Sequence, residues 1–359
     1  MVNKKGFSLR IGLSLICFAL LSGWTCSRSV PSTQGYYQNP ILLHRADPQI
    51  YKHRDGYYYF MSSVLPDFDR LELRKSKTLT GIKDTKPVDV FLKQPSGPLS
   101  HNLWAPEIHY IHNKWYIYFS AAGTPEVFDH RMFVLENNSP DPTQGTWVYK
   151  GQIVTNWDSF ALDATVFSHR GSLYLVWAQH DPAIAGNTNL YIAKMRNPWT
   201  IEGKQVMLSK PDLVWEQQGF WVNEGPAVLK RNGQIFLTYS ASSCDPRYLM
   251  GMLRASDTSD LLRADSWTKS PVPVFQSNPA AHVYGPGHNS FTVSPDGTED
   301  YLMYHAYSSN TVPTCFGDER SVRMQRFYWR PDGTPDFGQP VSEDVKLPLP
   351  SGEAAQQKR

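Results

Sequence analysis

Residues 220–242 read "FWVNEGPAVLKRNGQIFLTYSAS", and the pattern in this stretch decides the fold. Two short apolar runs, 227–229 and 235–239, flank the turn residues Arg231, Asn232 and Gly233. Apolar and aromatic runs around an Asn-Gly pair are typical of a β-hairpin. Glu224 stands just before Gly225, where the first strand begins. On its own, a glutamate at this place reads as an ordinary turn residue.

The same pattern recurs about every sixty residues, which indicates an internal repeat. Each copy has a polar or small leading residue, then an apolar residue, a turn and a second strand rich in aromatic residues. The apolar residues Ile50, Ile108, Val166, Val228 and Phe291 are separated by 58, 58, 62 and 63 positions. The copies are "ADPQIYKHRDGYYYFMSS" from Ala46, "APEIHYIHNKWYIYFSAA" from Ala105, "DATVFSHRGSLYLVWAQ" from Asp163, "GPAVLKRNGQIFLTYSAS" from Gly225 and "HNSFTVSPDGTEDYLMYHAY" from His288.

The second strands of the copies are β-branched and aromatic, and they have no helical periodicity. The rest of the chain after its N-terminal region also lacks a clean helical period, so the sequence predicts an all-β fold. A repeat of about sixty residues suits a four-stranded sheet with long loops, and radial repetition of such sheets makes a β-propeller. Five copies therefore predict a five-bladed β-propeller. The alternative is a two-sheet sandwich with accidental similarity, which the near-constant spacing disfavours.

The N-terminus is expected to be a secretory signal. Lys4, Lys5 and Arg10 precede the run "IGLSLICFALLSGW", which is short for a membrane span. The sequence thus predicts a secreted or periplasmic protein, with an uncleaved membrane anchor as the alternative. The expected organisation is a signal peptide over 1–26, a linker over 27–36, one propeller domain over 37–348 and a disordered tail over 349–359.

The cysteines leave two questions open. Cys26 lies where a bacterial lipoprotein carries its acylated cysteine, so membrane anchoring through lipidated Cys26 is a candidate, although Trp24 and Thr25 replace the usual small residues. Cys244 and Cys315 could pair in an oxidising compartment or stay as two separate thiols.

Composition narrows the class of partner. The chain has 359 residues and is 41% hydrophobic, which is enough for a full core. The formal net charge of +2 and the lack of a basic stripe argue against a nucleic acid as partner. No His-x-x-x-His or Cys-x-x-Cys pair is present, so no metal ligand set and no required cofactor are expected.

The leading positions of the repeats concentrate polar residues. Innermost strands line the central channel of a propeller, so we expect Asp47, Asp163, Glu224 and His288 to converge at one end of the axis. Buried charges cost free energy unless they are paired or used. Paired carboxylates suit glycoside hydrolysis, in which one donates a proton to the leaving oxygen and another activates water or attacks carbon.

These residues lie in motifs that resemble glycoside hydrolase family 43, five-bladed propeller enzymes that act on arabinose- and xylose-containing polysaccharides. The resemblance implies that Asp47 is the general base, Glu224 the general acid, and Asp163 the carboxylate that tunes and orients the acid. It also implies inversion, with base and acid roughly 6.5–9.5 Å apart. The motifs cover all five repeats: "HRADPQI" at 44–50, "LWAPEIHY" at 103–110, "LDATVF" at 162–167, "NEGPAVLKRNG" at 223–233 and "YGPGHNSF" at 284–291.

The resemblance also implies substrate-binding residues. His288 is similar to a histidine that holds a water or an ion near the axis. Either a structural Ca²⁺ or a water near His288 is therefore compatible with the resemblance. A late arginine of the family reaches the substrate, and Arg323 is the expected counterpart, with Arg320 and Arg326 close by. Aromatic planes pack on the C–H faces of sugars. The remaining candidates for the sugar site are Trp104, Trp221 and His44.

Within this family, residues 223–253 look most like α-L-arabinofuranosidases, including those that remove terminal arabinose from α-1,5-linked arabinan. We therefore expect release of α-L-arabinofuranosyl residues from arabinan or other arabinose-containing plant polysaccharides. β-Xylosidase or endo-arabinanase activity on the same scaffold is the first alternative, because sequence does not reveal which loops close the cleft. A non-catalytic glycan-binding propeller is the alternative of another class.

Overall fold

Four-stranded antiparallel sheets make up the fold of this computed structural model, which describes residues 35–312, 314 and 316–353. The predicted signal peptide 1–26, Cys26 and nearly all of the predicted linker 27–36 lie outside the described residues. The described residues belong to one compact unit. No helix in this part of the chain is long and apolar enough to cross a membrane.

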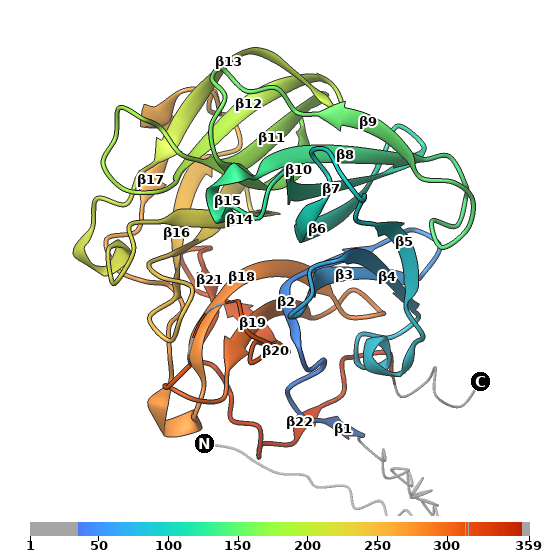
Figure 1. Cartoon of the computed structure of the whole chain (residues 1–359). Helices are drawn as coiled ribbons and strands as arrows, with labels where there is room; N and C mark the ends of the chain where they lie inside the picture. Colours follow the sequence, from blue (N-terminus) through green and yellow to red (C-terminus); the bar gives the residue numbers. More distant parts are fainter. Residues whose placement is uncertain (1–34, 313, 315, 354–359) are drawn as a thin grey trace, which may run out of the picture. The chain divides into compact units, whose positions relative to one another are not determined.

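The five repeats form five blades, each a sheet in sequence order (Figure 1). Blade 1 consists of β2 (Arg45–Lys52), β3 (Tyr58–Val64), β4 (Arg70–Ser76) and β5 (Val88–Leu92). Blade 2 consists of β6 (His101–Ile111), β7 (Lys114–Ala122), β8 (Arg131–Asn137) and β9 (Val148–Gln152). Blade 3 consists of β10 (Ala161–His169), β11 (Ser172–Gln179), β12 (Asn189–Asn197) and β13 (Thr200–Ser209).

The last two blades complete the ring. Blade 4 consists of β14 (Asn223–Arg231), β15 (Gln234–Ala241), β16 (Leu249–Ser256) and β17 (Thr268–Lys269). Blade 5 consists of β18 (Tyr284–Val293), β19 (Asp300–Tyr307), β20 (Ser321–Trp329) and β21 (Pro335–Asp336). The innermost strands contact one another in the order β2, β6, β10, β14, β18, and β18 contacts β2 again. The all-β, five-bladed propeller predicted from the repeats is confirmed.

The hairpin in residues 220–242 is also confirmed. Lys230 pairs with Ile235 and Arg231 pairs with Gln234 across β14 and β15. The two-residue loop is Asn232-Gly233, with φ values of 52° and 73°. Positive φ at both loop residues is the two-residue hairpin turn that matches the twist of the strands.

A β-bulge lies at the leading position of every blade. The pairing of each innermost strand with its neighbour slips at this point. A bulge with a left-handed residue bends the strand and re-aims the side chains around it. The bulge residues all have positive φ: 55° at Asp47, 44° at Ala105, 58° at Asp163, 55° at Gly225 and 45° at His288.

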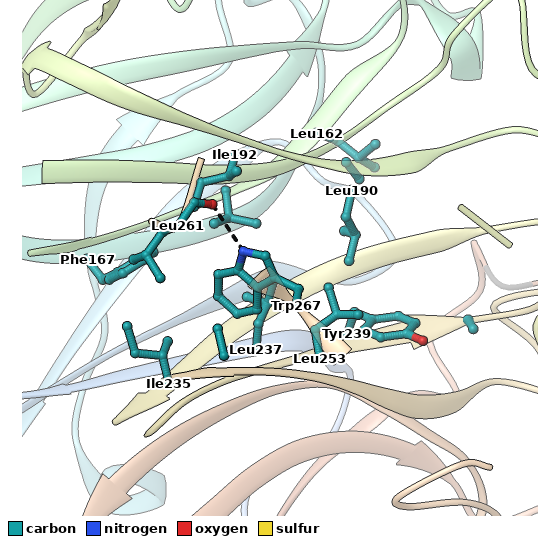
Figure 2. Close-up of a cluster of buried hydrophobic side chains, with 14 of the residues drawn as sticks. Leu162, Phe167, Leu190, Ile192, Ile235, Leu237, Tyr239, Leu253, Leu261 and Trp267 are labelled. Carbon is teal, nitrogen blue, oxygen red and sulfur yellow. Dashed lines mark hydrogen bonds between the residues drawn. The ribbon is translucent and has the colours of Figure 1, made fainter. Parts of the chain in front are cut away.

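Apolar side chains fill the space between neighbouring blades. Figure 2 shows the cluster between blades 3 and 4, where Trp267 lies among side chains of both sheets. Its indole N–H donates to the Leu261 carbonyl at 3.1 Å, so the polar edge of the ring is satisfied inside the core. From blade 3 the cluster includes Leu162, Phe167, Leu190 and Ile192, and from blade 4 Ile235, Leu237, Tyr239 and Leu253.

The two ends of the unit are better ordered than the sequence indicated. β1 (Tyr36–Tyr37), which spans the predicted boundary between linker and propeller, pairs with β22 (Leu347–Pro348). The predicted disordered tail is wrong for its first residues, because Leu349 packs on the core cluster that contains Tyr37 and donates its N–H to the Gly35 carbonyl. Residues 354–359 lie outside the described part.

Glu353 closes this end of the chain with a buried carboxylate. It accepts hydrogen bonds from the backbone N–H groups of Leu79 at 2.6 Å and Thr80 at 3.2 Å, and from the Thr80 hydroxyl. These donors belong to the start of the 3-10 helix η1 (Thr80–Asp84), whose first N–H groups have no partner within the helix. The residues expected to fray therefore cap an element of blade 1.

Cys244 is disulfide-bonded. Cys315, the partner that the sequence suggests, lies outside the described residues, as do Cys17 and Cys26.

Candidate active site

The bulges bring the predicted carboxylates together in one cavity of about 420 Å³. Asp47, Asp163 and Glu224 all line it, from blades 1, 3 and 4. Such a concave site with a few converging polar groups is where small ligands bind. The other lining residues are His288 and Arg320, the aromatic residues Phe68, Trp104, Phe128, Phe160, Phe220 and Phe316, and Ala105, Val127, Leu162, Asn187, Val222, Ser242, Ser243 and Cys244.

Asp47 lies beside one hydroxyl, one guanidinium and two imidazole rings. Ser63 Oγ donates to its Oδ2 at 2.5 Å, and Arg320 Nη1 lies 3.4 Å from its Oδ1. His288 Nδ1 and His305 Nδ1 lie 3.2 and 3.3 Å from the same Oδ1. Burial alone would raise the pKa of Asp47, but His288, Arg320 and His305 together hold this pKa well below its usual range. Asp47 is therefore ionised and suited to accept a proton.

Glu224 has the opposite environment. Burial and the Asp47 charge raise the pKa of Glu224 to about 7, although the hydrogen bond from Tyr248 and the Arg320 charge oppose the rise. Tyr248 Oη donates to Glu224 Oε1 at 2.9 Å and fixes the orientation of the carboxyl group. A carboxyl group that keeps its proton near neutral pH can serve as a general acid.

Asp163 contacts the neighbours of both Asp47 and Glu224. Its Oδ2 accepts the N–H of Gly225, the residue after Glu224, at 2.9 Å, and the same Oδ2 lies 4.0 Å from His288 Nδ1. Burial and the charges of Glu224 and Asp47 raise the pKa of Asp163 well above its usual range. The three carboxyl groups of this cavity oppose one another's ionisation, and the Arg320 guanidinium lies beside Asp47.

The predicted arginine needs a correction. Arg323 is 0% exposed, pairs with Glu343 and donates from Nη2 to Ser308 Oγ at 2.9 Å, so its side chain does not reach the cavity. Arg320 lies there instead, beside Asp47. The two residues are three positions apart, and side chains separated by an odd number along an extended chain point to opposite faces. The sequence pattern "RSVR" did not reveal which face is inward.

Two other predicted binding residues also lie outside the cavity lining. Trp221 is 43% exposed, while its neighbours Phe220 and Val222 line the cavity. His44 is more than half exposed, and its Nδ1 contacts the Asp318 carbonyl at 2.8 Å. His44 precedes the strand that carries Asp47 and turns towards blade 5.

Trp104 lines the cavity as expected, but one ring face is covered. His130 stacks on it, with ring centroids 3.7 Å apart and planes inclined by 14°. Phe316 lies at a centroid distance of 5.8 Å and an angle of 18°, so Trp104 belongs to an aromatic stack that forms one wall. A sugar ring would therefore meet this wall and not an isolated indole face.

Sequence reasoning missed residues that hold the carboxylates in place. Tyr248 and His305 form a stacked pair with centroids 5.6 Å apart, and Tyr248 bonds Glu224 while His305 accepts the Asp47 N–H at 3.0 Å. His305 lies within the quoted repeat, at the place where three other blades carry serine, and that departure was the available signal. Tyr248 had no comparable sequence signal.

The next feature is whether the side chains of the site could hold a metal ion. Among the described residues, no group of three or more His, Cys, Asp or Glu side chains could hold a metal ion. His288 Nδ1 faces Asp47 and Asp163, so this nitrogen interacts with carboxylates.

Comparisons with known proteins agree with the fold and identify the family. Residues 37–335 match the model of "Glycosyl hydrolases family 43". The chain is 48% identical over 335 residues to an extracellular exo-alpha-(1->5)-L-arabinofuranosidase of Streptomyces avermitilis, covering 92% of this chain and 69% of that protein. It is 50% identical over 270 residues to the protein of the same name from Streptomyces chartreusis, covering 75% of this chain and 82% of that protein.

Solved structures extend the likeness to three dimensions. The crystal structure of an alpha-L-arabinofuranosidase from Lactobacillus brevis superposes with a TM-score of 0.84 at 52% identity, covering 86% of this chain and 98% of that chain. A thermostable family-43 glycoside hydrolase gives a TM-score of 0.72 at 25% identity, covering 88% and 99%. The five-bladed propeller, the three convergent carboxylates and these matches together show that the chain is a glycoside hydrolase and belongs to glycosyl hydrolase family 43.

Proposed function

We propose that this enzyme is an inverting α-L-arabinofuranosidase that removes arabinofuranosyl residues from arabinan or other arabinose-containing plant polysaccharides. The observation that carries the proposal is the difference in pKa between two carboxyl groups that line one cavity. Asp47 is held ionised, whereas the pKa of Glu224 is raised to about 7. Carboxyl groups whose pKa values are pushed apart identify the base and the acid of a glycosidase.

In the proposed reaction, Asp47 takes a proton from a water molecule as the water oxygen bonds to the anomeric carbon. Glu224 gives its proton to the glycosidic oxygen as the bond between that oxygen and the anomeric carbon breaks. The products are arabinose with an inverted anomeric centre and the shortened glycan. Asp47 ends protonated and Glu224 ionised, and proton exchange with solvent restores both groups.

The choice of arabinose rests on the relatives. The Streptomyces avermitilis and Streptomyces chartreusis proteins are named as exo-acting on α-1,5 linkages, and the Lactobacillus brevis protein as an arabinofuranosidase. The test is a rate comparison on p-nitrophenyl α-L-arabinofuranoside, p-nitrophenyl β-D-xyloside and linear α-1,5-arabinan. We expect release of arabinose monomers from the first and the last. Turnover of the xyloside alone would make the enzyme a β-xylosidase, and release of oligomers would make it an endo-arabinanase.

The proposed mechanism draws its acid and base from side chains and needs no transition metal. We expect full activity after dialysis against a chelator such as EDTA. Loss of activity that zinc restores would contradict this part of the proposal. Loss that only Ca²⁺ restores would instead indicate a structural ion near His288.

We also propose that the enzyme is exported. The basic and apolar N-terminal segment supports export, and two relatives are named extracellular. Anchoring through lipidated Cys26 is the finer proposal. Expression with a radiolabelled fatty acid should label the wild-type chain and leave Cys26→Ser unlabelled. Equal absence of label from both would reject the anchor.

A further inference from the structure

A repeated hydrogen bond links four of the five bulges to the preceding blade. In these four, the N–H of the bulge residue donates to a side chain at the end of the second strand of the blade before it. This contact joins neighbouring blades beside the cavity that the carboxyl groups line. The four side-chain acceptors are Ser63 Oγ for Ala105 at 2.8 Å, Ser120 Oγ for Asp163 at 3.2 Å, Ser240 Oγ for His288 at 2.7 Å and His305 Nδ1 for Asp47 at 3.0 Å.

The strand registers show that these acceptors occupy equivalent places. In each blade the acceptor pairs with the residue that precedes the bulge residue of its own innermost strand. The pairs are Ala46 with Ser63, Trp104 with Ser120, Leu162 with Ala178, Glu224 with Ser240 and Gly287 with His305. The fifth equivalent place, in blade 3, is therefore Ala178.

Ala178 cannot accept a hydrogen bond through its side chain. The Gly225 N–H of blade 4 would meet this place, and it donates instead to Asp163 Oδ2 at 2.9 Å. Ala178 is fully buried in the cluster between blades 3 and 4 shown in Figure 2, and it does not line the cavity. The exception to the repeated contact thus falls beside the catalytic carboxyl groups.

Blade 1 shows what a serine does next to a bulge carboxylate. Ser63 Oγ accepts the Ala105 N–H at 2.8 Å and donates to Asp47 Oδ2 at 2.5 Å, so the hydroxyl stands between the carboxylate and the amide of the next blade. In blade 3 the hydroxyl is missing, and Asp163 binds the next blade's amide directly. The two arrangements therefore differ by one side-chain oxygen atom, which Ser63 has and Ala178 lacks.

We propose that Ala178 is a positioning residue, whose missing hydroxyl makes Asp163 bind directly to the backbone of the strand that carries the general acid. Gly225 follows Glu224 immediately, so the bond fastens Asp163 to the peptide next to the acid. The inference rests on the proposed function, because it assigns the consequence to the proton-donating step. Ala178 lies outside the cavity, yet it sets the position of Asp163 relative to Glu224 inside the cavity.

Ala178→Ser tests the proposal by restoring the residue type found in three other blades. We expect the introduced hydroxyl to accept the Gly225 N–H and to donate to Asp163, which separates the carboxylate from the strand of Glu224. For α-1,5-L-arabinobiose, kcat should fall by tenfold or more, up to about 10²-fold, the effect of a misplacement of about 1 Å. KM should stay nearly unchanged, because Ala178 does not line the cavity.

The leaving group separates an acid defect from general damage. A p-nitrophenyl aglycone needs little protonation to leave, so Ala178→Ser should lose much less activity on p-nitrophenyl α-L-arabinofuranoside. Ala178→Gly, which adds no hydroxyl, should keep the wild-type ratio of the two rates. An Ala178→Ser protein that melts as the wild type does and keeps this ratio would overturn the inference. No arabinose release by the wild type from either substrate would instead overturn the proposed function.

Ser63→Ala provides the reciprocal change if Ala178→Ser does not fold. Without the interposed hydroxyl, Asp47 should become the acceptor of the Ala105 N–H, as Asp163 is for Gly225. The base is then displaced, and water activation is needed whatever group leaves. Both substrates should lose activity by a similar factor. Unchanged rates on both substrates would show that the serine hydroxyl at this place does not position the carboxylate, and the role inferred for Ala178 would then be rejected.

Discussion

At the scale of single residues, the environments of Asp47 and Glu224 decide the chemistry. Asp47 faces two histidines and an arginine, whereas Glu224 is half-buried and accepts a hydrogen bond from the Tyr248 hydroxyl. The same residue class thus takes two protonation states in one cavity. His305 and Tyr248 stack on each other, and each forms a hydrogen bond with one of the two residues, so the pair holds Asp47 and Glu224 in a fixed relation.

The pH dependence of kcat/KM should report this split. The acid must be protonated and the base ionised, so activity should be lost as pH rises through about 7, where Glu224 ionises. The limb on the acidic side should lie at low pH, because the pKa of Asp47 is held well below its usual range. A profile on arabinobiose with its alkaline limb near the ordinary pKa of a glutamate would contradict the assignment.

Replacement of the acid gives a second prediction at this scale. Glu224→Gln keeps the shape of the side chain and removes the transferable proton, so the rate on arabinobiose should fall by about 10²–10⁴-fold or more. The alkaline limb should disappear as well. Glu202→Gln, on the surface beside Lys194, is the matched control and should keep the wild-type rate. An unchanged rate in Glu224→Gln would show that the protein does not use this acid.

At the scale of elements, every blade has a β-bulge at the same position of its innermost strand. It places a left-handed residue where the strand enters the channel, and it turns the neighbouring side chains towards the cavity. Gly225 suits this conformation without cost, whereas Asp47, Asp163, Ala105 and His288 adopt it despite a side chain. The hydrogen bonds that their N–H groups donate to the preceding blades hold these residues in place.

The packing between blades makes its own prediction. Trp267→Ala should destabilise the protein by about 3–5 kcal/mol, because it removes a large ring from the cluster between blades 3 and 4 and leaves a cavity. Urea unfolding followed by circular dichroism would measure the loss. Val214→Ala is a suitable control, because Val214 is 87% exposed and should change stability by less than about 0.5 kcal/mol. Equal stability of the two variants would contradict the role of the cluster.

Much of this element-scale account was accessible from the sequence. The constant spacing fixed the blades, and the shared repeat position brought Asp47, Asp163 and His288 to one place. The orientation of Arg323 was not accessible, because one residue of register decides whether Arg320 or Arg323 faces the cavity. Tyr248 and Ala178 were also hidden, because their contacts depend on how neighbouring blades meet.

At the scale of the whole molecule, contacts near both ends of the described residues hold the ring. β1 pairs with β22, and Glu353 binds the start of η1 in blade 1. The sequence "SGEAAQQKR" looked like a polar tail because one glutamate among small and polar residues gives no burial signal. Its contacts become visible only once residues far apart in the sequence are brought together.

Replacement of Glu353 tests this closure. Glu353→Ala should cost about 1–3 kcal/mol by leaving buried N–H groups of Leu79 and Thr80 without an acceptor. Glu353→Gln keeps an acceptor. Burial raises the pKa of Glu353, so the stability that the protonated side chain contributes is present at low pH and lost as pH rises through the folded-state pKa.

Thermal melting of the wild type, Glu353→Ala and Glu353→Gln at about pH 4 and about pH 8 would separate the effect of the lost hydrogen bonds from the effect of ionising Glu353. Glu353→Gln should gain in melting temperature relative to the wild type on going from the lower pH to the higher. Glu353→Ala should melt below Glu353→Gln at both. If Glu353→Ala melts at the wild-type temperature, the contact does not secure the end of the chain.

The most direct test of the account is the configuration of the first product. Proton NMR at early times, with the wild-type enzyme and an α-L-arabinofuranoside, distinguishes the anomers before they equilibrate. If Asp47 activates water while Glu224 protonates the leaving oxygen, β-L-arabinofuranose must appear first. Initial appearance of the α anomer would mean retention through a covalent intermediate, and it would contradict the roles assigned to both carboxyl groups.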